Sequence, residues 1–170
     1  MPKVFLRVVA YLILCLCTLI STANATEKVK GKVVRVIDGD TFELLVNKTT
    51  YKVRLNAIDA PEKGQDFYQK SKQALVSLCF SKTVTVELLK KDRYGRWIGE
   101  VYSADGQYIN GRMISDGYAW HYTKYSKSAP LAAAESTAKR KKLGLWAQGK
   151  PVAPWEYRKS PAKTKQRKAA

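Results

Sequence analysis

The sequence predicts an α+β fold in which five short strands form a small Greek-key β-barrel and about three helices pack against it. Two observations predict this fold class. Segments rich in Val, Leu and Thr show the alternating apolar pattern of strands, and turns containing Gly, Asp or Asn separate them. Other segments place apolar residues at helical spacing, and one of these lies between the third and fourth predicted strands.

The first three predicted strands form a meander. Residues 28–37 (KVKGKVVRVI) are rich in valine and alternate in part, and the DGD sequence at 38–40 is a turn signal. We expect the second strand over residues 41–46 and the third over residues 51–57. Strands one and three both neighbour strand two and run in the same direction, so their C-terminal ends meet at one edge of the sheet.

The second half of the domain alternates between helices and strands. A helix is predicted over residues 66–79, where Leu75, Leu78 and Cys79 recur at helical spacing. The remaining predicted elements are strands over 83–89 and 97–102, and helices over 109–115 and 130–142. Five short strands with a helix after the third are typical of the partly open oligonucleotide/oligosaccharide-binding barrel, or OB-fold.

Residues 1–25 have the features of a secretory signal peptide. Lys3 and Arg7 give a positive start, residues 8–20 are mostly apolar, and residues 23–25 form an A-x-A cleavage site. The alternative is a membrane anchor, but the apolar stretch of about 13 residues is shorter than the roughly 20 that a bilayer requires. We therefore expect cleavage after Ala25 and a secreted or periplasmic protein without a transmembrane segment.

After removal of the signal, about 145 residues remain, which is enough for one domain with a sizeable core. We expect the domain to span residues 26–149 and a basic tail, rich in Pro and Lys, to span residues 150–170. Trp155 and Tyr157 could still dock on the domain. Cys79 is then the single cysteine, so an intramolecular disulfide is excluded. We expect Cys79 to be a small buried apolar residue.

The charge of the chain is strongly one-sided. The formal net charge is +17, and loss of Lys3 and Arg7 with the signal lowers it to about +15. So basic a small domain indicates an anionic partner, which could be nucleic acid, acidic polysaccharide or a phospholipid surface. Composition alone does not choose among these three.

Four acidic residues fall at two turns that the meander brings together. Asp38 and Asp40 follow the first strand, and Asp59 and Glu62 follow the third. A cluster of like charges is unfavourable unless a hard divalent cation balances it, and Ca²⁺ and Mg²⁺ prefer oxygen ligands. A zinc site with nitrogen and sulfur ligands is improbable, because the chain has one histidine, His121, and one mature cysteine.

Two arginines are expected near the same edge. Arg54 lies on the third strand, and Arg96 lies in the DRYGR turn between strands four and five. The planar guanidinium makes paired hydrogen bonds to phosphate and stays charged. Phosphodiester hydrolysis needs a stabiliser of negative charge, a metal and a group that positions water. Each motif alone is more often an ordinary turn, and only their joint order points to this chemistry.

Taken together, VIDGDT at 36–41, VRL at 53–55, DAPE at 59–62 and DRYGR at 92–96 resemble the staphylococcal (micrococcal) nuclease family. The resemblance extends over about residues 28–146, and LGLW at 143–146 is similar to the closing motif of the family. It implies an OB-fold barrel and a Ca²⁺-dependent endonuclease, with one ion per domain, that acts on DNA and RNA. The implied products carry 3′-phosphate and 5′-hydroxyl ends.

The resemblance also implies roles for single residues. Asp40 and Asp59 would be calcium ligands, together with the backbone carbonyl of Ala60. Glu62 would orient or deprotonate the attacking water. Arg54 and Arg96 would bind the scissile phosphate and stabilise the transition state.

A second group of residues is implied to support the site or bind substrate. Asp38 and Thr41 would shape the calcium turn. Arg93 stands where a lysine is familiar in the family, and Ala60 replaces a threonine. The aromatic residues that best match those flanking a nucleotide base are Tyr94, Tyr122 and Tyr125. His121 in its aromatic surroundings is expected to be structural.

Two other functions remain open from the residues alone. One is a non-catalytic nucleic-acid-binding domain on the same barrel, although the full acidic and arginine set favours catalysis. The other is an exported protein that binds acidic polysaccharide or a membrane surface, for which the basic segment 159–168 would be suited. No stable protein partner is implied, and a monomer is expected.

Overall fold

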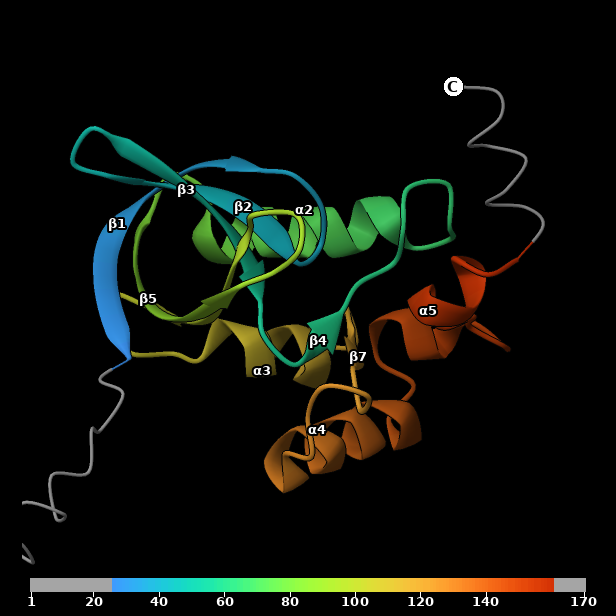
Figure 1. The fold of residues 1–170 in the computed structure, drawn as a ribbon. Coiled ribbons are helices and arrows are strands. Elements are labelled where there is room, and N and C mark those ends of the chain that lie inside the picture. The colour runs from blue at the N-terminus through green and yellow to red at the C-terminus, as the bar shows by residue number, and fades with distance from the viewer. Residues whose placement is uncertain (1–25, 161–170) are drawn as a thin grey trace, which may run out of the picture.

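The computed structural model describes residues 26–160, and five of its strands form a closed barrel in the order β1-β2-β3-β6-β5. The α+β barrel predicted from the sequence is confirmed (Figure 1). The strands are β1 (Glu27–Val36), β2 (Thr41–Val46), β3 (Thr49–Leu55), β5 (Thr83–Lys91) and β6 (Trp97–Ser103). The predicted signal peptide, residues 1–25, lies outside the described residues.

The barrel closes through the parallel pairing of β3 with β6, whereas its other neighbouring strands are antiparallel. The barrel is therefore closed, whereas a partly open barrel was expected from the sequence. In the β2–β3 ladder Thr41 pairs with Arg54, and in the β3–β6 ladder Arg54 pairs with Ile98. This register places the DGD turn, the end of β3 and the start of β6 side by side.

A second, two-stranded sheet joins β4 (Ile58–Asp59) to β7 (Trp120–His121). Asp59 pairs with Trp120 and Ile58 with His121. These strands were not predicted, because two residues are too few to show a periodic pattern. The sheet fixes the backbone of Asp59 just beyond the end of β3.

Helices cover the barrel and extend it on one side (Figure 1). They are α2 (Tyr68–Cys79), α3 (Ile109–Ser115), α4 (Ala129–Arg140), the 3₁₀ helix η1 (Gly144–Ala147) and α5 (Pro154–Tyr157). The first three agree with the predicted helices to within two residues at each end, whereas η1 and α5 were not predicted. Cys79 is fully buried at the end of α2, as expected. Within residues 26–160 no helix has the length and apolar character to cross a bilayer.

The main core fills the barrel and the space beneath α2 and α3, with Val33, Phe42, Leu55, Leu75 and Met113 fully buried. A smaller apolar cluster joins Trp120 of β7 to Leu145 and Ala153, and Trp155 packs against it. Residues 150–160, within the segment predicted as a tail, are thus packed on the domain. This second cluster brings the C-terminal segment close to β4 and β7.

Candidate active site

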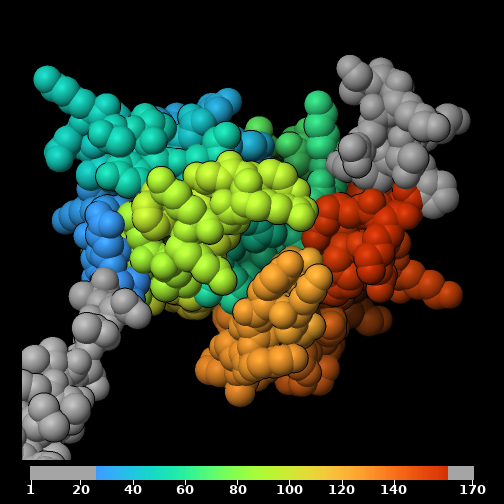
Figure 2. Space-filling model, viewed as in Figure 1, coloured from blue at the N-terminus to red at the C-terminus, as the bar shows by residue number. Residues whose placement is uncertain are grey.

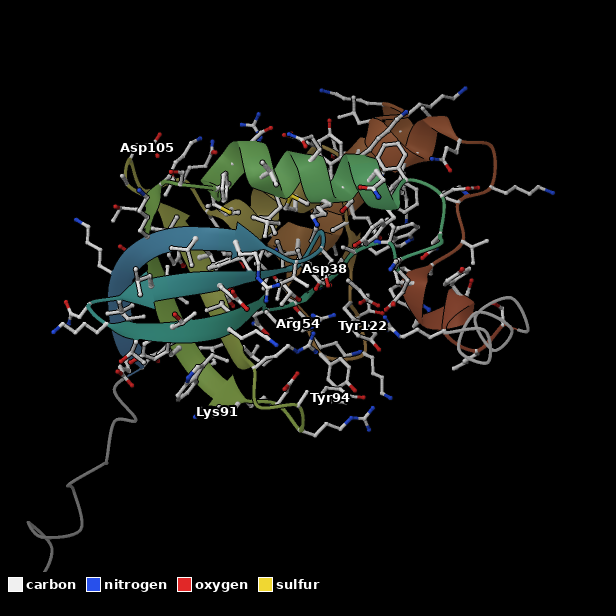
Figure 3. All side chains as sticks on the ribbon, turned by 90° about the horizontal axis from the view of Figure 1, so that it is seen from above. Asp38, Arg54, Lys91, Tyr94, Asp105 and Tyr122 are labelled. Atoms are coloured by element: carbon white, nitrogen blue, oxygen red, sulfur yellow. The ribbon has the colours of Figure 1, made fainter. Side chains whose placement is uncertain are left out.

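The predicted acidic residues and Arg54 gather at one end of the barrel. Figure 3 shows Asp38, Arg54, Tyr94 and Tyr122 toward this end, away from Asp105. The backbone brings the parts together, because the Leu55 N–H donates to the Asp40 carbonyl at 2.8 Å. The Ala60 N–H donates to Asp40 Oδ2 at 3.1 Å. The two acidic turns therefore converge as the meander predicted.

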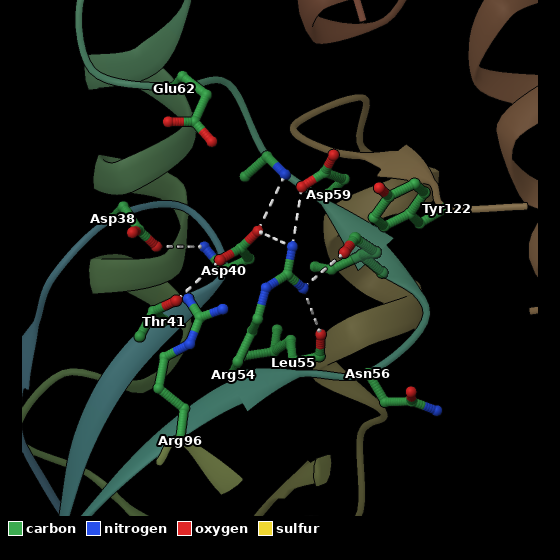
Figure 4. A network of polar contacts seen from close by, with 12 residues as sticks. Asp38, Asp40, Thr41, Arg54, Leu55, Asn56, Asp59, Glu62, Arg96 and Tyr122 are labelled. Carbon is green, nitrogen blue, oxygen red and sulfur yellow. Dashed lines mark hydrogen bonds and ion pairs between the residues drawn. The ribbon is translucent and has the colours of Figure 1, made fainter. Parts of the chain in front are cut away.

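The turn from Asp38 to Thr41 is held by its own side chains (Figure 4). Asp38 Oδ1 accepts a hydrogen bond from the Asp40 N–H at 3.1 Å, and Thr41 Oγ1 donates to Asp40 Oδ1 at 2.8 Å. Gly39 packs against α2 so closely that a Cβ there would lie 2.0 Å from Ser71 Oγ. The turn thus requires glycine at its centre and aims the Asp40 carboxylate at the end of β3.

Arg54 is the centre of the cluster. Its Nη2 lies 3.1 Å from Asp40 Oδ2 and 2.8 Å from Asp59 Oδ1, and its Nη1 donates to the Ile58 carbonyl at 3.0 Å. The Asp40 and Asp59 side chains are almost completely buried. One guanidinium therefore joins two buried carboxylates that come from different turns.

The pKa values show the electrostatic state of this edge. Burial raises the pKa of Asp40, but Arg54 and hydrogen bonds from Thr41 and Ala60 outweigh it and hold the pKa below its usual range. Burial and then the charge of Asp40 raise the pKa of Asp38 to about 7. Burial raises the pKa of Asp59 to about 6, although Arg158 and Arg54 oppose it. The edge thus favours additional positive charge.

The donor set fits a hard divalent cation. Asp40 and Asp59 supply carboxylate oxygens that converge on one point, now taken by the Arg54 guanidinium. Oxygen ligands of this kind suit Ca²⁺ or Mg²⁺. Among residues 26–160 no three acidic, histidine or cysteine side chains are already grouped around a metal position. The Ala60 backbone meets Asp40 through its N–H, and its carbonyl as a ligand stays a prediction.

Arg158 also enters this cluster and was missed from the sequence. Its Nη2 lies 2.7 Å from Asp59 Oδ2, and its Nη1 donates to Glu62 Oε1 at 2.9 Å. Asp59 thus binds two arginines, and Glu62 is linked to Asp59 through the second one. The sequence offered one signal, the aromatic residues Trp155 and Tyr157 beside Arg158 in an otherwise Pro- and Lys-rich segment.

Arg96 is held by the turn that carries it. Asp92 Oδ1 accepts hydrogen bonds from the backbone of Tyr94 and Arg96, and Asp92 Oδ2 lies 2.7 Å from Arg96 Nη2. In Figure 4 the Arg96 guanidinium points toward the Thr41 and Arg54 side chains. Arg93 and Tyr94 contact each other, and Tyr94 is 68 % exposed. Asp92 is therefore a supporting residue that was not singled out from the sequence.

The aromatic residues have different surroundings. Tyr122 follows β7, and its ring stacks on Trp155 with a 5.2 Å centroid distance and a 5° angle. Tyr125 contacts Tyr122 edge to face and is 66 % exposed. His121 is buried, and its Nε2 lies 3.0 Å from Ser126 Oγ, whereas its structural role stays a prediction. Tyr122 thus borders the carboxylate cluster, and Tyr94 and Tyr125 lie on the surface around it.

Carboxylates that can hold a hard cation and arginines that match a phosphate meet two of the three requirements of phosphodiester hydrolysis, and Glu62 is the candidate for the third, the positioning of water. One end of this barrel brings these candidates together, and the combination fits the class of nucleases. Residues 52–148 match the family described as staphylococcal nuclease homologue. The chain belongs to the staphylococcal nuclease family, and it is an endonuclease-type hydrolase, as the combined motifs predicted.

Individual relatives agree with this assignment. An uncharacterized endonuclease of Escherichia coli O157:H7 is 43% identical over 130 residues, which cover 76% of this chain and 85% of the relative. A micrococcal nuclease of Shigella flexneri is 41% identical over 153 residues, which cover 84% of this chain and 87% of the relative. An uncharacterized endonuclease of Haemophilus influenzae is 41% identical over 139 residues, covering 81% and 78%.

Proposed function

We propose that the protein is an exported, Ca²⁺-dependent endonuclease that cleaves DNA and RNA with little sequence specificity. Its products would carry 3′-phosphate and 5′-hydroxyl ends. The observation that carries this proposal is the position of Arg54 Nη2 between the buried carboxylates of Asp40 and Asp59. The guanidinium proposed to bind phosphate and the two carboxylates proposed to bind the metal ion are in direct contact there.

The residues divide the work between them. Asp40 and Asp59 would hold one Ca²⁺ ion, with the Ala60 carbonyl as a further ligand, and Asp38 and Thr41 fix the turn that carries Asp40. When bound, the ion supplies Lewis-acid activation and charge for the phosphate. Arg54 and Arg96 bind the scissile phosphate and stabilise the negative charge that develops on its oxygens. Glu62 orients the attacking water or takes its proton.

Low sequence specificity follows from which parts of the substrate the site can contact. The net charge, about +15 once Lys3 and Arg7 are removed with the signal, and the cluster of arginines act on the sugar-phosphate backbone, which every nucleic acid shares. The exposed Arg93 adds positive charge near the substrate. The exposed rings of Tyr94 and Tyr125 offer faces for stacking, which tolerates any base, and Tyr122, already stacked on Trp155, would border the bound nucleotide. Backbone binding with stacking also accepts both deoxyribose and ribose.

Export rests on residues 1–25, which carry the signal features and are removed after Ala25 in this proposal. The protein then acts as a monomer in the periplasm or the medium. A calcium-dependent activity suits these compartments, because extracellular calcium sites operate at 10⁻⁴–10⁻³ M, roughly. Sequencing the N-terminus of the exported protein tests the cleavage site.

Incubation of the purified protein with plasmid DNA and with RNA tests the activity. We expect cleavage in Ca²⁺ and none with excess chelator. Product ends are tested with polynucleotide kinase, which should label 5′ ends without prior phosphatase treatment. Salt-sensitive binding without cleavage would favour the non-catalytic nucleic-acid-binding alternative, and labelling only after phosphatase treatment would overturn the assigned product ends.

A further inference from the structure

The C-terminal segment 150–160 is packed into the domain beside the carboxylate cluster. Figure 2 shows this segment, in red, directly against the rest of the molecule. Ala153 is buried with Trp120 and Leu145, and the Gln65 side chain donates a hydrogen bond to the Val152 carbonyl. Apolar packing and a hydrogen bond to the loop after Glu62 thus anchor the segment before its last turn.

Trp155 and Arg158 lie three residues apart, so one turn of helix presents both toward the same neighbour. Trp155 stacks flat on Tyr122, and the Arg158 guanidinium lies 5.9 Å from the centre of the same ring. Arg158 Nη2 also lies 3.4 Å from the Tyr122 hydroxyl. The aromatic stack therefore fixes the position of the Arg158 guanidinium.

The guanidinium makes a fork between two carboxylates. Nη2 contacts Asp59 Oδ2 at 2.7 Å, and Nη1 contacts both Asp59 Oδ1 at 3.2 Å and Glu62 Oε1 at 2.9 Å. The Asp59 side chain is 1% exposed and the Arg158 side chain 34%. An ordinary surface pair is held by two mobile side chains and is weak, whereas this one has a buried partner and a packed base. Such a fork restricts the direction of each carboxylate that it binds.

We propose that Arg158 is a positioning residue for hydrolysis, which holds the Glu62 carboxylate in a fixed relation to Asp59. The inference rests on the proposed role of Glu62 at the water. Arg54 and Arg96 are assigned to the phosphate, and Arg158 acts on the carboxylates instead. The active site then includes the C-terminal segment, although 96 residues separate Arg158 from Glu62 in the chain. A small displacement of a reacting group can slow a reaction by about 100-fold.

The test compares Arg158→Ala and Arg158→Lys with Lys159→Ala, which removes an equal charge from the next, exposed residue. Each change is made in the wild-type protein and in Glu62→Gln. The measurements are kcat and KM for a labelled oligonucleotide in Ca²⁺, oligonucleotide affinity in chelator, and thermal melting. Binding in chelator separates a loss of positioning from a loss of substrate affinity.

We expect Arg158→Ala to lower kcat by about 10- to 100-fold with KM changed by less than about threefold. Arg158→Lys should recover part of kcat, because it keeps the charge but not the fork. In Glu62→Gln the further loss from Arg158→Ala should be less than about threefold, since coupled residues are not additive. Lys159→Ala should resemble the wild type, and oligonucleotide affinity should be equal for Arg158→Ala and Lys159→Ala.

Three results would overturn the inference. The first is an Arg158→Ala enzyme that matches Lys159→Ala. The second is an equal loss of kcat in the wild-type and Glu62→Gln backgrounds, which would show that Arg158 does not act through Glu62. The third is faster cleavage after removal of Arg158, which would make the contact inhibitory. Absence of any cleavage by the wild-type protein would instead refute the proposed function, so the two failures are distinguishable.

Discussion

Arg54 Nη2 and Asp59 Oδ1 lie 2.8 Å apart, and this pair joins the end of β3 to β4, five residues further along the chain. Because Arg54 also contacts Asp40, the same guanidinium connects both acidic turns. Both carboxylates are buried, so they depend on this positive charge or on one that replaces it. A divalent cation bound to Asp40 and Asp59 would have to displace arginine from these oxygens.

Replacement of Arg54 by alanine should therefore make stability depend on calcium. Breaking a buried ion pair by removing one partner costs about 3–5 kcal/mol, so we expect a loss of this order in the free energy of unfolding in chelator. Added Ca²⁺ should stabilise Arg54→Ala more than the wild type, because the Arg54 guanidinium no longer competes for Asp40, and only Arg158 still competes for Asp59. Urea denaturation with and without Ca²⁺ measures both effects. An equal gain from Ca²⁺ in the two proteins would contradict the competition.

A matched control for this prediction is Arg35→Ala. Arg35 forms an ion pair with Glu43 on the barrel surface, where its side chain is 61% exposed. Exposed pairs contribute little to stability. The denaturation curve of Arg35→Ala should therefore stay close to that of the wild type with and without Ca²⁺.

Arg96 and Arg93 share one turn but should differ in kinetic effect. Arg96 is fixed by Asp92 and points toward Arg54, so Arg96→Ala should lower kcat by about 10²- to 10³-fold. Arg93 contacts only the exposed Tyr94 in this turn, so Arg93→Ala should mainly raise KM. It should also reduce the slope of log affinity against log salt concentration by about one. Steady-state kinetics at several salt concentrations separate the two. Equal kcat values for the two variants would refute the assignment of Arg96 to the phosphate.

Gly39 is required by the close approach of the DGD turn to α2. In Gly39→Ala the new methyl group would overlap Ser71 Oγ, whose hydroxyl donates to the Tyr118 carbonyl at 2.7 Å. We expect a loss of about 1–3 kcal/mol in the free energy of unfolding, as for other overpacked positions. Because Asp40 moves, half-maximal cleavage should also need a higher Ca²⁺ concentration. Gly149→Ala is the control, because a Cβ there meets no atom within 4 Å. Similar melting temperatures for both variants would contradict this prediction.

The thiol of Cys79 should be unreactive in the folded protein. Burial raises the pKa of Cys79 to about 12, so at pH 8 the folded thiol is almost entirely protonated. In the exported chain a disulfide-exchange reagent should modify no cysteine at pH 8 until guanidinium unfolds the protein, and then one. Because the folded pKa exceeds the unfolded value of about 8.5, the stability due to this thiol is complete below that pH. This contribution to stability falls as the pH rises toward 12. Rapid labelling of the native protein at pH 8 would contradict the prediction, because it would show that Cys79 is accessible.

The strand pattern made most of the barrel predictable, together with the convergence of the two acidic turns. Alternating residues in the meander determine which turns meet, and this pattern predicts that Asp40 and Asp59 lie at the same edge. Two-residue strands such as β4 carry no periodic signal, and barrel closure depends on the β3–β6 pairing over a long chain separation. Arg158 was missed because its site is created by tertiary packing of Ala153 and Trp155, in a segment whose composition resembles a tail.

We propose that Glu62 and its neighbours hydrolyse the phosphodiester bond at this end of the barrel. Single-turnover cleavage of a labelled oligonucleotide in saturating Ca²⁺ tests it most directly, with wild type, Glu62→Gln and the exposed control Glu156→Gln. We predict that Glu62→Gln cleaves about 10²- to 10⁴-fold more slowly, with unchanged oligonucleotide affinity and melting temperature, and that Glu156→Gln cleaves at the wild-type rate. Cleavage by Glu62→Gln at the rate of Glu156→Gln would place the chemistry elsewhere and contradict the claim.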